Sequence, residues 1–199
     1  SYSIMAIDAS SVRELRDRTS AGFLDCKNAL EEANGDFERA GEILRKKGLA
    51  NAMKKGSRGT PEGRVGSYIH TNGKVGVLIE INCETDFVAK NDVFGDLVKD
   101  ICMHIAATDP MAVSRETVPQ EMIDREKKAY NEEFKDKPDN VRDKIIDGKM
   151  ESFYKEVCLI NQPFVKDNDQ TIEDLLKTAI TKLGENVKIS RFARFAIGE

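Results

Sequence analysis

The sequence has little of what metal sites and redox centres need. It has no tryptophan, and only two histidines and four cysteines occur among its 199 residues. The cysteines stand far apart and form no CxxC pair, at Cys26, Cys83, Cys102 and Cys158. Closely spaced thiols and imidazoles are the usual zinc ligands, so we expect no metal site and no cofactor. Isolated thiols of this kind are typical of reduced, buried cysteines, which favours a cytoplasmic protein.

Long apolar segments and an excess of basic charge are also missing. No apolar run approaches the roughly 18 residues that a membrane-spanning helix needs, so we expect no membrane partner. The formal net charge is -4, whereas proteins that bind nucleic acids usually carry a basic excess. We therefore expect no direct contact with nucleic acid. A hydrophobic content of 40% with 33% charged residues is that of an ordinary globular protein.

The spacing of apolar residues predicts a small helical unit followed by a larger mixed one. Residues 1–54 contain the pattern of three short helices around one core, the first capped by Ser11 and the third capped by Asp36 and ending at Gly48. Residues 55–63 are rich in glycine and charge, which indicates a linker. Residues 64–199 form the second unit.

One hairpin stands out in the second unit. Two apolar runs flank Asn72-Gly73, the strongest short hairpin turn, and counting outward pairs Tyr68 with Val77. The alternating segment 187–197 predicts a further strand in the same sheet, with Val187, Ile189, Ala193, Phe195 and Ile197 on one side.

The rest of this unit is mostly helical. An amphipathic helix capped by Asp92 follows the hairpin. Two charged helices near 119–136 and 139–160 have a short connection, which predicts an antiparallel helical hairpin. Residues 162–170 indicate a polar loop, and Thr171 caps a last helix that ends at Gly184.

No residue set makes a convincing catalytic centre. Gly73-Lys74-Val75-Gly76 is glycine-rich and basic but does not complete a phosphate-binding loop, and hairpin turn chemistry accounts for it. Cys83 and His70 could mimic a nucleophile and base, but a thiol at a strand end beside a half-exposed histidine explains both more simply. We expect no catalytic residues and no enzyme.

Two apolar positions leave alternatives open. In the stretch CETDFVAKND at 83–92, Thr85 or Asp86 can cap a turn that carries Phe87 and Val88. Both apolar side chains can pack under the sheet, or one can project as an anchor for a partner. Leu24, off the core stripe of its helix, is either a scattered exposed leucine or a partner contact.

Four blocks of the sequence resemble the elongation factor Ts family. They are LRDRTSAGFLDCKNALEEANGD at 15–36, VGVLIEINCETDFVAKND at 75–92, NQPFVKD at 161–167 and GENVKISRFARF at 184–195. The resemblance covers essentially the whole chain and is closest to the short form with a single core repeat. It implies an α+β fold, with an N-terminal domain like a ubiquitin-associated domain and a core of antiparallel sheet packed with helices and a helical hairpin.

The same resemblance implies a function and a partner. The family are guanine nucleotide exchange factors for elongation factor Tu. Carried onto this chain, Thr85, Asp86, Phe87 and Val88 enter the GTPase domain, with Asp86 and Phe87 as the wedge that displaces the elements holding Mg²⁺ and the phosphates. Arg16, Phe23 and Leu24 match the positions that contact the partner from the N-terminal domain. Phe87 should then be exposed in the free protein and Val88 should point inward.

Two further expectations accompany this interpretation. Some short forms of the family dimerise through the last strand of the core, so a homodimer through that strand stays open. Ala193 matches the position where certain members carry a cysteine, which excludes a disulfide there. An alternative from another class is a ubiquitin-binding module, because Gly22-Phe23-Leu24 and Ala29-Leu30 resemble the surface of that domain.

Overall fold

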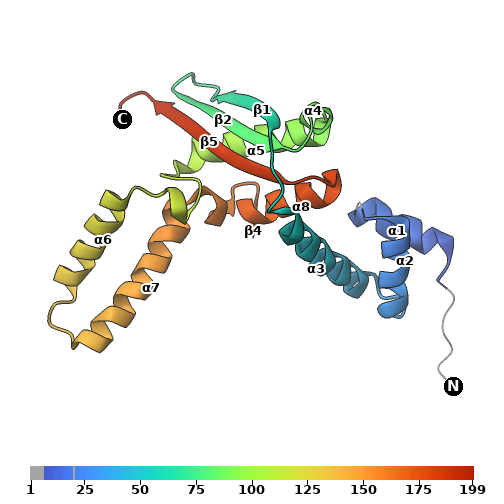
Figure 1. Cartoon of the computed structure of the whole chain (residues 1–199), viewed down its shortest axis with the longest axis horizontal. Helices are drawn as coiled ribbons and strands as arrows, with labels where there is room; N and C mark the ends of the chain where they lie inside the picture. The colour runs from blue at the N-terminus through green and yellow to red at the C-terminus, as the bar shows by residue number, and fades with distance from the viewer. Residues whose placement is uncertain (1–6, 20) are drawn as a thin grey trace.

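The chain forms two helical arms beneath a three-stranded sheet (Figure 1). A computed structural model describes residues 7–19 and 21–199; residues 1–6 and Ser20, which fall in the expected N-terminal unit, lie outside the described residues. The elements are α1 (Ala9–Thr19), α2 (Phe23–Glu32), α3 (Phe37–Lys55), β1 (Glu62–Ile69), β2 (Val75–Cys83), α4 (Asp86–Ala89), α5 (Asp92–Thr108), α6 (Gln120–Glu133), α7 (Asp139–Val157), β3 (Pro163–Phe164), β4 (Asp167–Thr171), α8 (Ile172–Leu183) and β5 (Val187–Ala196), with short 3-10 turns at Arg115–Thr117 and Leu159–Asn161.

The first three helices enclose a small core of their own. Its buried members are Val12, Leu15, Cys26, Ala29, Leu30, Ala33, Ala40 and Leu44. Asp36 caps α3 by accepting the Arg39 N–H, as the sequence predicts. The predicted start of α1 is wrong, because the carboxylate of Asp8 accepts the Ser11 N–H at 2.7 Å and the helix begins at Ala9.

Helix α3 does not end at Gly48, contrary to the sequence prediction. It continues to Lys55 and carries the chain from the N-terminal helices to the larger unit, where Ala52 joins the main core. At Gly48 a Cβ atom would lie 3.2 Å from Thr181 Oγ1 of α8, and that hydroxyl donates to the Gly48 carbonyl at 3.2 Å. The glycine therefore permits two helices to cross closely and does not terminate one.

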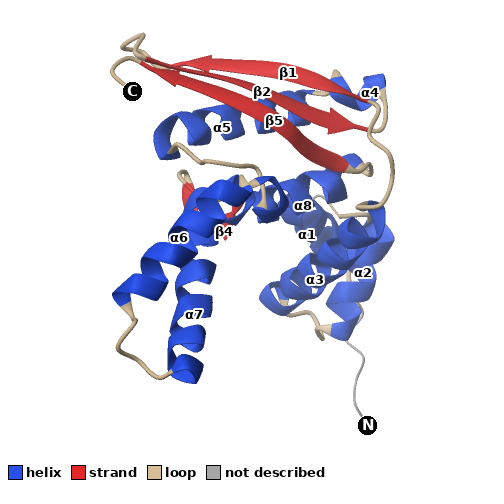
Figure 2. Ribbon diagram, turned by 60° about the vertical axis from the view of Figure 1, so that its left-hand side comes forward, coloured by secondary structure: helices blue, strands red, loops and turns tan. Residues whose placement is uncertain are grey.

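The sheet has the strand order β1-β2-β5 and is antiparallel throughout (Figure 2). Tyr68 pairs with Val77 as predicted, and Gly73 takes the positive φ of 68° that the hairpin turn requires. Helix α5 covers one face of the sheet, over Val77, Ile79 and Ile81. Its cap is Asn91, whose side chain accepts the Val93 N–H, and not Asp92 as expected.

A bulge in β5 overturns the prediction that its apolar residues share one side. Ile81 pairs with Ile189 and Glu80 pairs with Arg191, so Ser190 is an extra residue without a partner on β2. An extra residue moves every later side chain to the opposite face. Val187 and Ile189 are consequently buried, whereas Phe195 points to the exposed outer face of the sheet.

The second arm is the helical hairpin predicted from the sequence. Helices α6 and α7 lie side by side and project from the core (Figures 1 and 2). They share a small cluster that includes Ile123, Ile146 and Phe153. The expected polar loop at 162–170 instead contains the strand pair β3–β4.

Helix α8 follows this strand pair. Its capping box joins Thr171 to Asp174, and Gly184 ends it in the left-handed conformation, as expected. Across residues 7–19 and 21–199, no helix has the length and apolar content needed to cross a bilayer.

Candidate functional site

The single turn of α4 is the centre of the candidate site. Thr85 is its N-cap: Oγ1 accepts the Val88 N–H at 3.3 Å, and the Thr85 carbonyl accepts the Ala89 N–H at 3.1 Å. The sequence left the cap open between Thr85 and Asp86, and the structure assigns it to Thr85. Its side chain fixes the direction in which the next four residues point.

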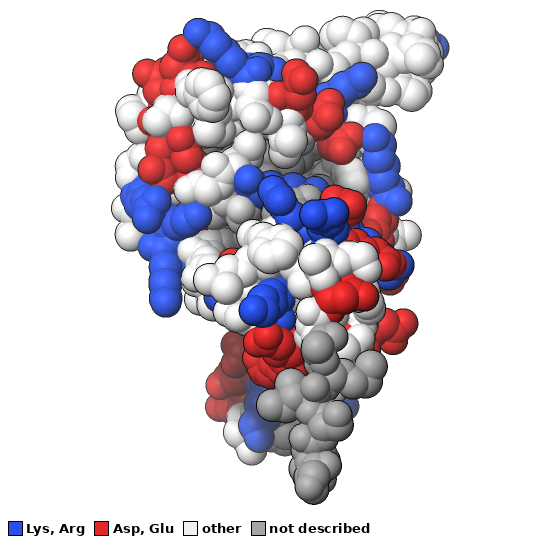
Figure 3. Space-filling view, turned by 90° about the vertical axis from the view of Figure 1, so that its right-hand side faces the viewer, with Lys and Arg blue, Asp and Glu red and all other residues white. Residues whose placement is uncertain are grey.

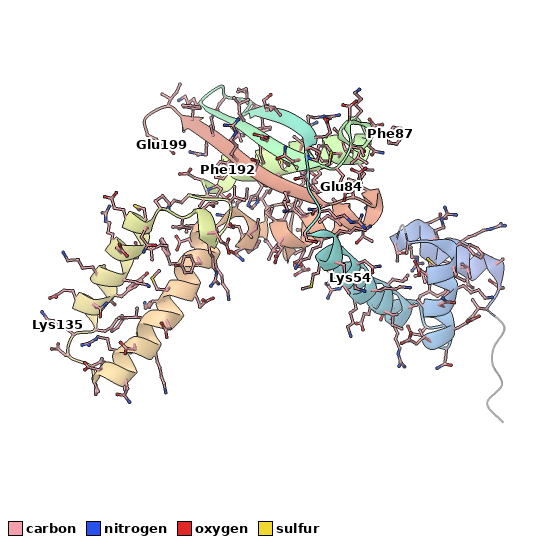
Figure 4. All side chains as sticks on the ribbon, viewed as in Figure 1. Lys54, Glu84, Phe87, Lys135, Phe192 and Glu199 are labelled. Carbon is pink, nitrogen blue, oxygen red and sulfur yellow. The ribbon has the colours of Figure 1, made fainter. Side chains whose placement is uncertain are left out.

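This turn exposes one apolar side chain and buries its neighbour. Phe87 is 84% exposed, whereas Val88 is 6% exposed and packs in the main core together with Ala89. The expected directions of the two side chains are confirmed. Figure 4 shows Phe87 at the outer surface of α4, pointing away from the sheet. An exposed phenylalanine on a fixed turn contributes no burial to the fold but is available to a partner.

Asp86, the residue before Phe87, is also exposed. Its carboxylate accepts a hydrogen bond from Lys90 Nζ at 2.5 Å, one helical turn later. This hydrogen bond raises the pKa of Lys90. Both side chains are well exposed, so the pair orients the carboxylate but adds little to stability.

A distant carboxylate, which the sequence pattern does not predict, holds the beginning of α4. Glu185, in the turn between α8 and β5, accepts the N–H groups of Glu84 and Thr85, each at 3.0 Å. Its other oxygen accepts the Thr85 hydroxyl at 2.6 Å. The periodicity of the sequence contains no signal for this contact, because the two segments lie about 100 residues apart.

Cys83 anchors the strand side of the same turn. Its thiol is buried and donates to the Thr85 carbonyl at 3.2 Å, and burial raises its pKa. His70 lies beyond the other end of the hairpin, since β1 and β2 pair from Glu62–Cys83 to Ile69–Gly76. Cys83 and His70 therefore do not form a nucleophile–base pair. Within the described residues, no group of three or more metal-ligating side chains comes together.

The N-terminal candidates lie on α1 and at the start of α2. Arg16 is exposed on α1, and Phe23 and Leu24 open α2 with 46% and 67% of their surfaces exposed. Helices α1 and α2 and the α4 turn lie toward the right-hand end of both views, α4 beside the sheet and α1 and α2 in the arm below it (Figures 1 and 2). Charged side chains of both signs are interspersed over this end, so no single-sign field covers it (Figure 3).

Together, the fold and the site define an α+β protein with a separate three-helix unit and an exposed, capped aromatic turn. Comparison with known proteins identifies the family. The sequence model of the family described as Elongation factor TS matches residues 52–199. The chain belongs to the elongation factor Ts family, and its role is that of a translation elongation factor.

Relatives from three bacteria resemble nearly the whole chain. Elongation factor Ts of Fervidobacterium nodosum is 58% identical over 197 residues, which cover 98% of this chain and 100% of that protein. The Thermosipho melanesiensis protein of the same name is 55% identical over 195 residues, 97% of this chain and 100% of its own. That of Geobacter sulfurreducens is 55% identical over 197 residues, 98% of this chain and 91% of its own.

Proposed function

We propose that this chain is a guanine nucleotide exchange factor that binds elongation factor Tu·GDP and promotes GDP release. In this proposal Asp86 and Phe87 enter the GTPase domain as a wedge, flanked by Thr85 and Val88. The factor acts in the cytoplasm through protein–protein contact, without bond-making chemistry and without contact to nucleic acid or membrane. The observation that carries the proposal is the 84% exposure of Phe87 on a turn fixed by a side-chain cap.

Linkage determines what such a wedge has to supply. If the factor weakens GDP binding by a given ratio, GDP weakens binding of the factor by the same ratio. Each tenfold change needs about 1.4 kcal/mol of differential interaction. Burying one phenylalanine contributes about 1.5–3 kcal/mol. Phe87 alone can therefore account for one to two factors of ten in GDP release.

A second contact through the N-terminal helices supports the same proposal. Arg16, Phe23 and Leu24 form an exposed surface on α1 and α2, which α3 joins to the core as one continuous helix. When two contacts are held on one rigid body, the second forms without a large loss of translational freedom. This surface would raise the affinity for Tu, whereas the wedge would displace the elements that hold Mg²⁺ and the phosphates.

We also propose that the outer face of the sheet accommodates a second copy of the chain. The exposed apolar residues on this face and at its end are Val65, Ile69, Leu78, Phe195 and Ile197. Exposed apolar side chains gathered on one face favour an interface. Ala193 pairs with Leu78 in this sheet. Because alanine has no thiol, the association would be non-covalent at this position.

Release of a fluorescent GDP analogue from elongation factor Tu, followed by stopped flow, tests the exchange function. We expect the parent chain to accelerate release and Phe87→Ala and Asp86→Ala to lose most of that acceleration. Excess GDP should also weaken capture of Tu by the parent, as linkage requires. If both variants accelerate release as well as the parent, the wedge proposal fails.

A further inference from the structure

The turn between α8 and β5 contacts the α4 turn and also the backbone just after α3, the helix that joins α1 and α2 to the core. Its two residues, Glu185 and Asn186, follow the helix-ending Gly184. Glu185 reaches the beginning of α4, and Asn186 reaches the chain that leaves α3. Neither residue is one of the expected partner contacts.

Glu185 satisfies the N–H groups that precede the wedge. Its carboxylate accepts from the Glu84 and Thr85 N–H groups and from the Thr85 hydroxyl. That hydroxyl is the group that caps α4 through Val88 N–H. Glu185 therefore holds the capping side chain in place, and through it the direction of the turn that carries Phe87.

The contact is reciprocal. While the Glu84 N–H donates to Glu185, the Glu84 side chain accepts the Asn186 N–H at 2.7 Å. Arg58 Nη1 lies 3.6 Å from the same Glu84 oxygen and offsets part of the charge of the two carboxylates. Two turns about 100 residues apart are thus joined in both directions.

Asn186 extends the connection to the end of α3. Its side chain is 1% exposed, and Nδ2 donates to the carbonyls of Arg58 at 2.7 Å and Gly56 at 3.3 Å. Both carbonyls lie just after α3, the helix that joins α1 and α2 to the core. A buried amide of this kind needs hydrogen-bond partners, and these two carbonyls supply them.

We propose that Glu185 and Asn186 are positioning residues for exchange, which fix the Asp86–Phe87 turn and the end of α3 relative to each other. The proposal rests on the proposed exchange function. Glu185 keeps the wedge in its competent direction, and Asn186 holds the backbone that leaves α3, the helix that joins the N-terminal surface to the core. A partner that engages both then meets a preorganised surface.

The test compares Glu185→Ala with Glu185→Gln in the full chain, with Glu133→Ala on the exposed face of α6 as the matched control. Alanine removes all three accepted hydrogen bonds. Glutamine keeps one oxygen for the two N–H groups, and its amide can donate to the Thr85 hydroxyl, which still accepts from Val88. We expect the maximal GDP release rate to fall about tenfold in Glu185→Ala and to stay near the parent rate in Glu185→Gln.

Amide hydrogen exchange on the free factor measures the same effect without Tu. The N–H groups of Ala89, Lys90 and Asn91 are bonded within the α4 turn. In Glu185→Ala we expect them to exchange about ten to a hundred times faster, as expected from the loss of capping contacts, whereas amides of α6 should not change. Glu133→Ala should match the parent at both places.

Asn186→Ala separates the second connection from the first. We expect faster amide exchange at Arg58, whose N–H bonds to Lys55. We also expect about a tenfold higher half-saturating concentration of factor, with a maximal release rate near that of the parent, because the wedge contact with Glu185 is retained. Thermal unfolding of each variant shows whether a loss is global.

The outcomes of these experiments distinguish a failure of the positioning proposal from a failure of the exchange function. Equal losses in Glu185→Ala and Glu185→Gln would mean that the charge acts directly on the partner, which overturns positioning. Parent-like release together with parent-like amide exchange in Glu185→Ala also overturns it. If the parent itself does not accelerate GDP release, the exchange function fails, and amide exchange still decides whether Glu185 fixes the turn.

Discussion

Truncating Phe87 and Val88 should have opposite effects on stability and exchange. Phe87→Ala removes a side chain that is 84% exposed, so the free energy of unfolding should change by no more than about 0.5 kcal/mol. Val88→Ala removes two methyl groups from a side chain that is 6% exposed in the main core. At about 0.8 kcal/mol per group, with a small cavity term, the loss is about 2 kcal/mol.

For GDP release we expect the opposite order, with a larger loss in Phe87→Ala than in Val88→Ala. If Phe87 is buried in the partner, its loss removes about 1.5–3 kcal/mol of interaction, which corresponds to about 10- to 150-fold in acceleration of release. Val88→Ala keeps the projecting side chain, so its release rate at saturating factor should stay closer to that of the parent. Because the two residues are adjacent, a general disturbance of the turn would affect both alike.

Urea unfolding, thermal unfolding and stopped-flow GDP release, measured on both variants and the parent, check this pair. For a chain of this size, a loss of about 2 kcal/mol in Val88→Ala lowers the melting temperature by about 4–8 °C. Equal destabilisation by the two variants would mean that Phe87 packs in the fold. A release rate that falls more in Val88→Ala than in Phe87→Ala would refute the wedge.

Three further predictions test the scaffold. Gly66→Ala should destabilise by about 1–3 kcal/mol, because its Cβ would lie 2.1 Å from Val98 Cγ1. The control Gly41→Ala, with no atom near, should stabilise α3 by up to about 1 kcal/mol, and urea unfolding measures both. Burial lowers the pKa of His104 from 6.5. The stability that the neutral imidazole contributes is therefore fully present above pH 6.5 and is lost as the pH falls toward the lower pKa of the folded state. His104→Gln should reduce this loss, which urea unfolding at a series of pH values measures. Phe195→Lys should weaken self-association in sedimentation, and a parent that is monomeric at every concentration would refute the proposed dimer.

Features set by neighbouring residues were predictable from the sequence. The Asn72-Gly73 turn, the Asp36 and Thr171 caps and the end of α8 each depend on residues within about four positions. Their geometry follows from the local side chains, whatever packs around them. The exposed direction of Phe87 also followed, but from the family resemblance, since periodicity allowed it to be buried.

Features set by packing were not predictable in the same way. A glycine after a basic turn favours a helix end, but contact with Thr181 decides how α3 behaves at Gly48. Alternation along β5 predicts one apolar side, but pairing with β2 leaves Ser190 as a bulge and reverses the rest. In each case the sequence pattern is present, but contact with a second element, α8 or β2, determines the structure that forms.

The proposed wedge shows why a site of this kind is hard to predict from a single sequence. An exposed Phe87 contributes almost nothing to folding, so other groups must stabilise the turn that carries it. The buried Val88 supplies the apolar contact, Thr85 supplies the cap, and Glu185 holds the cap from another part of the chain. Because the projecting residue and its supports are different residues, we expect substitutions at Phe87 to alter the proposed function while leaving the fold intact.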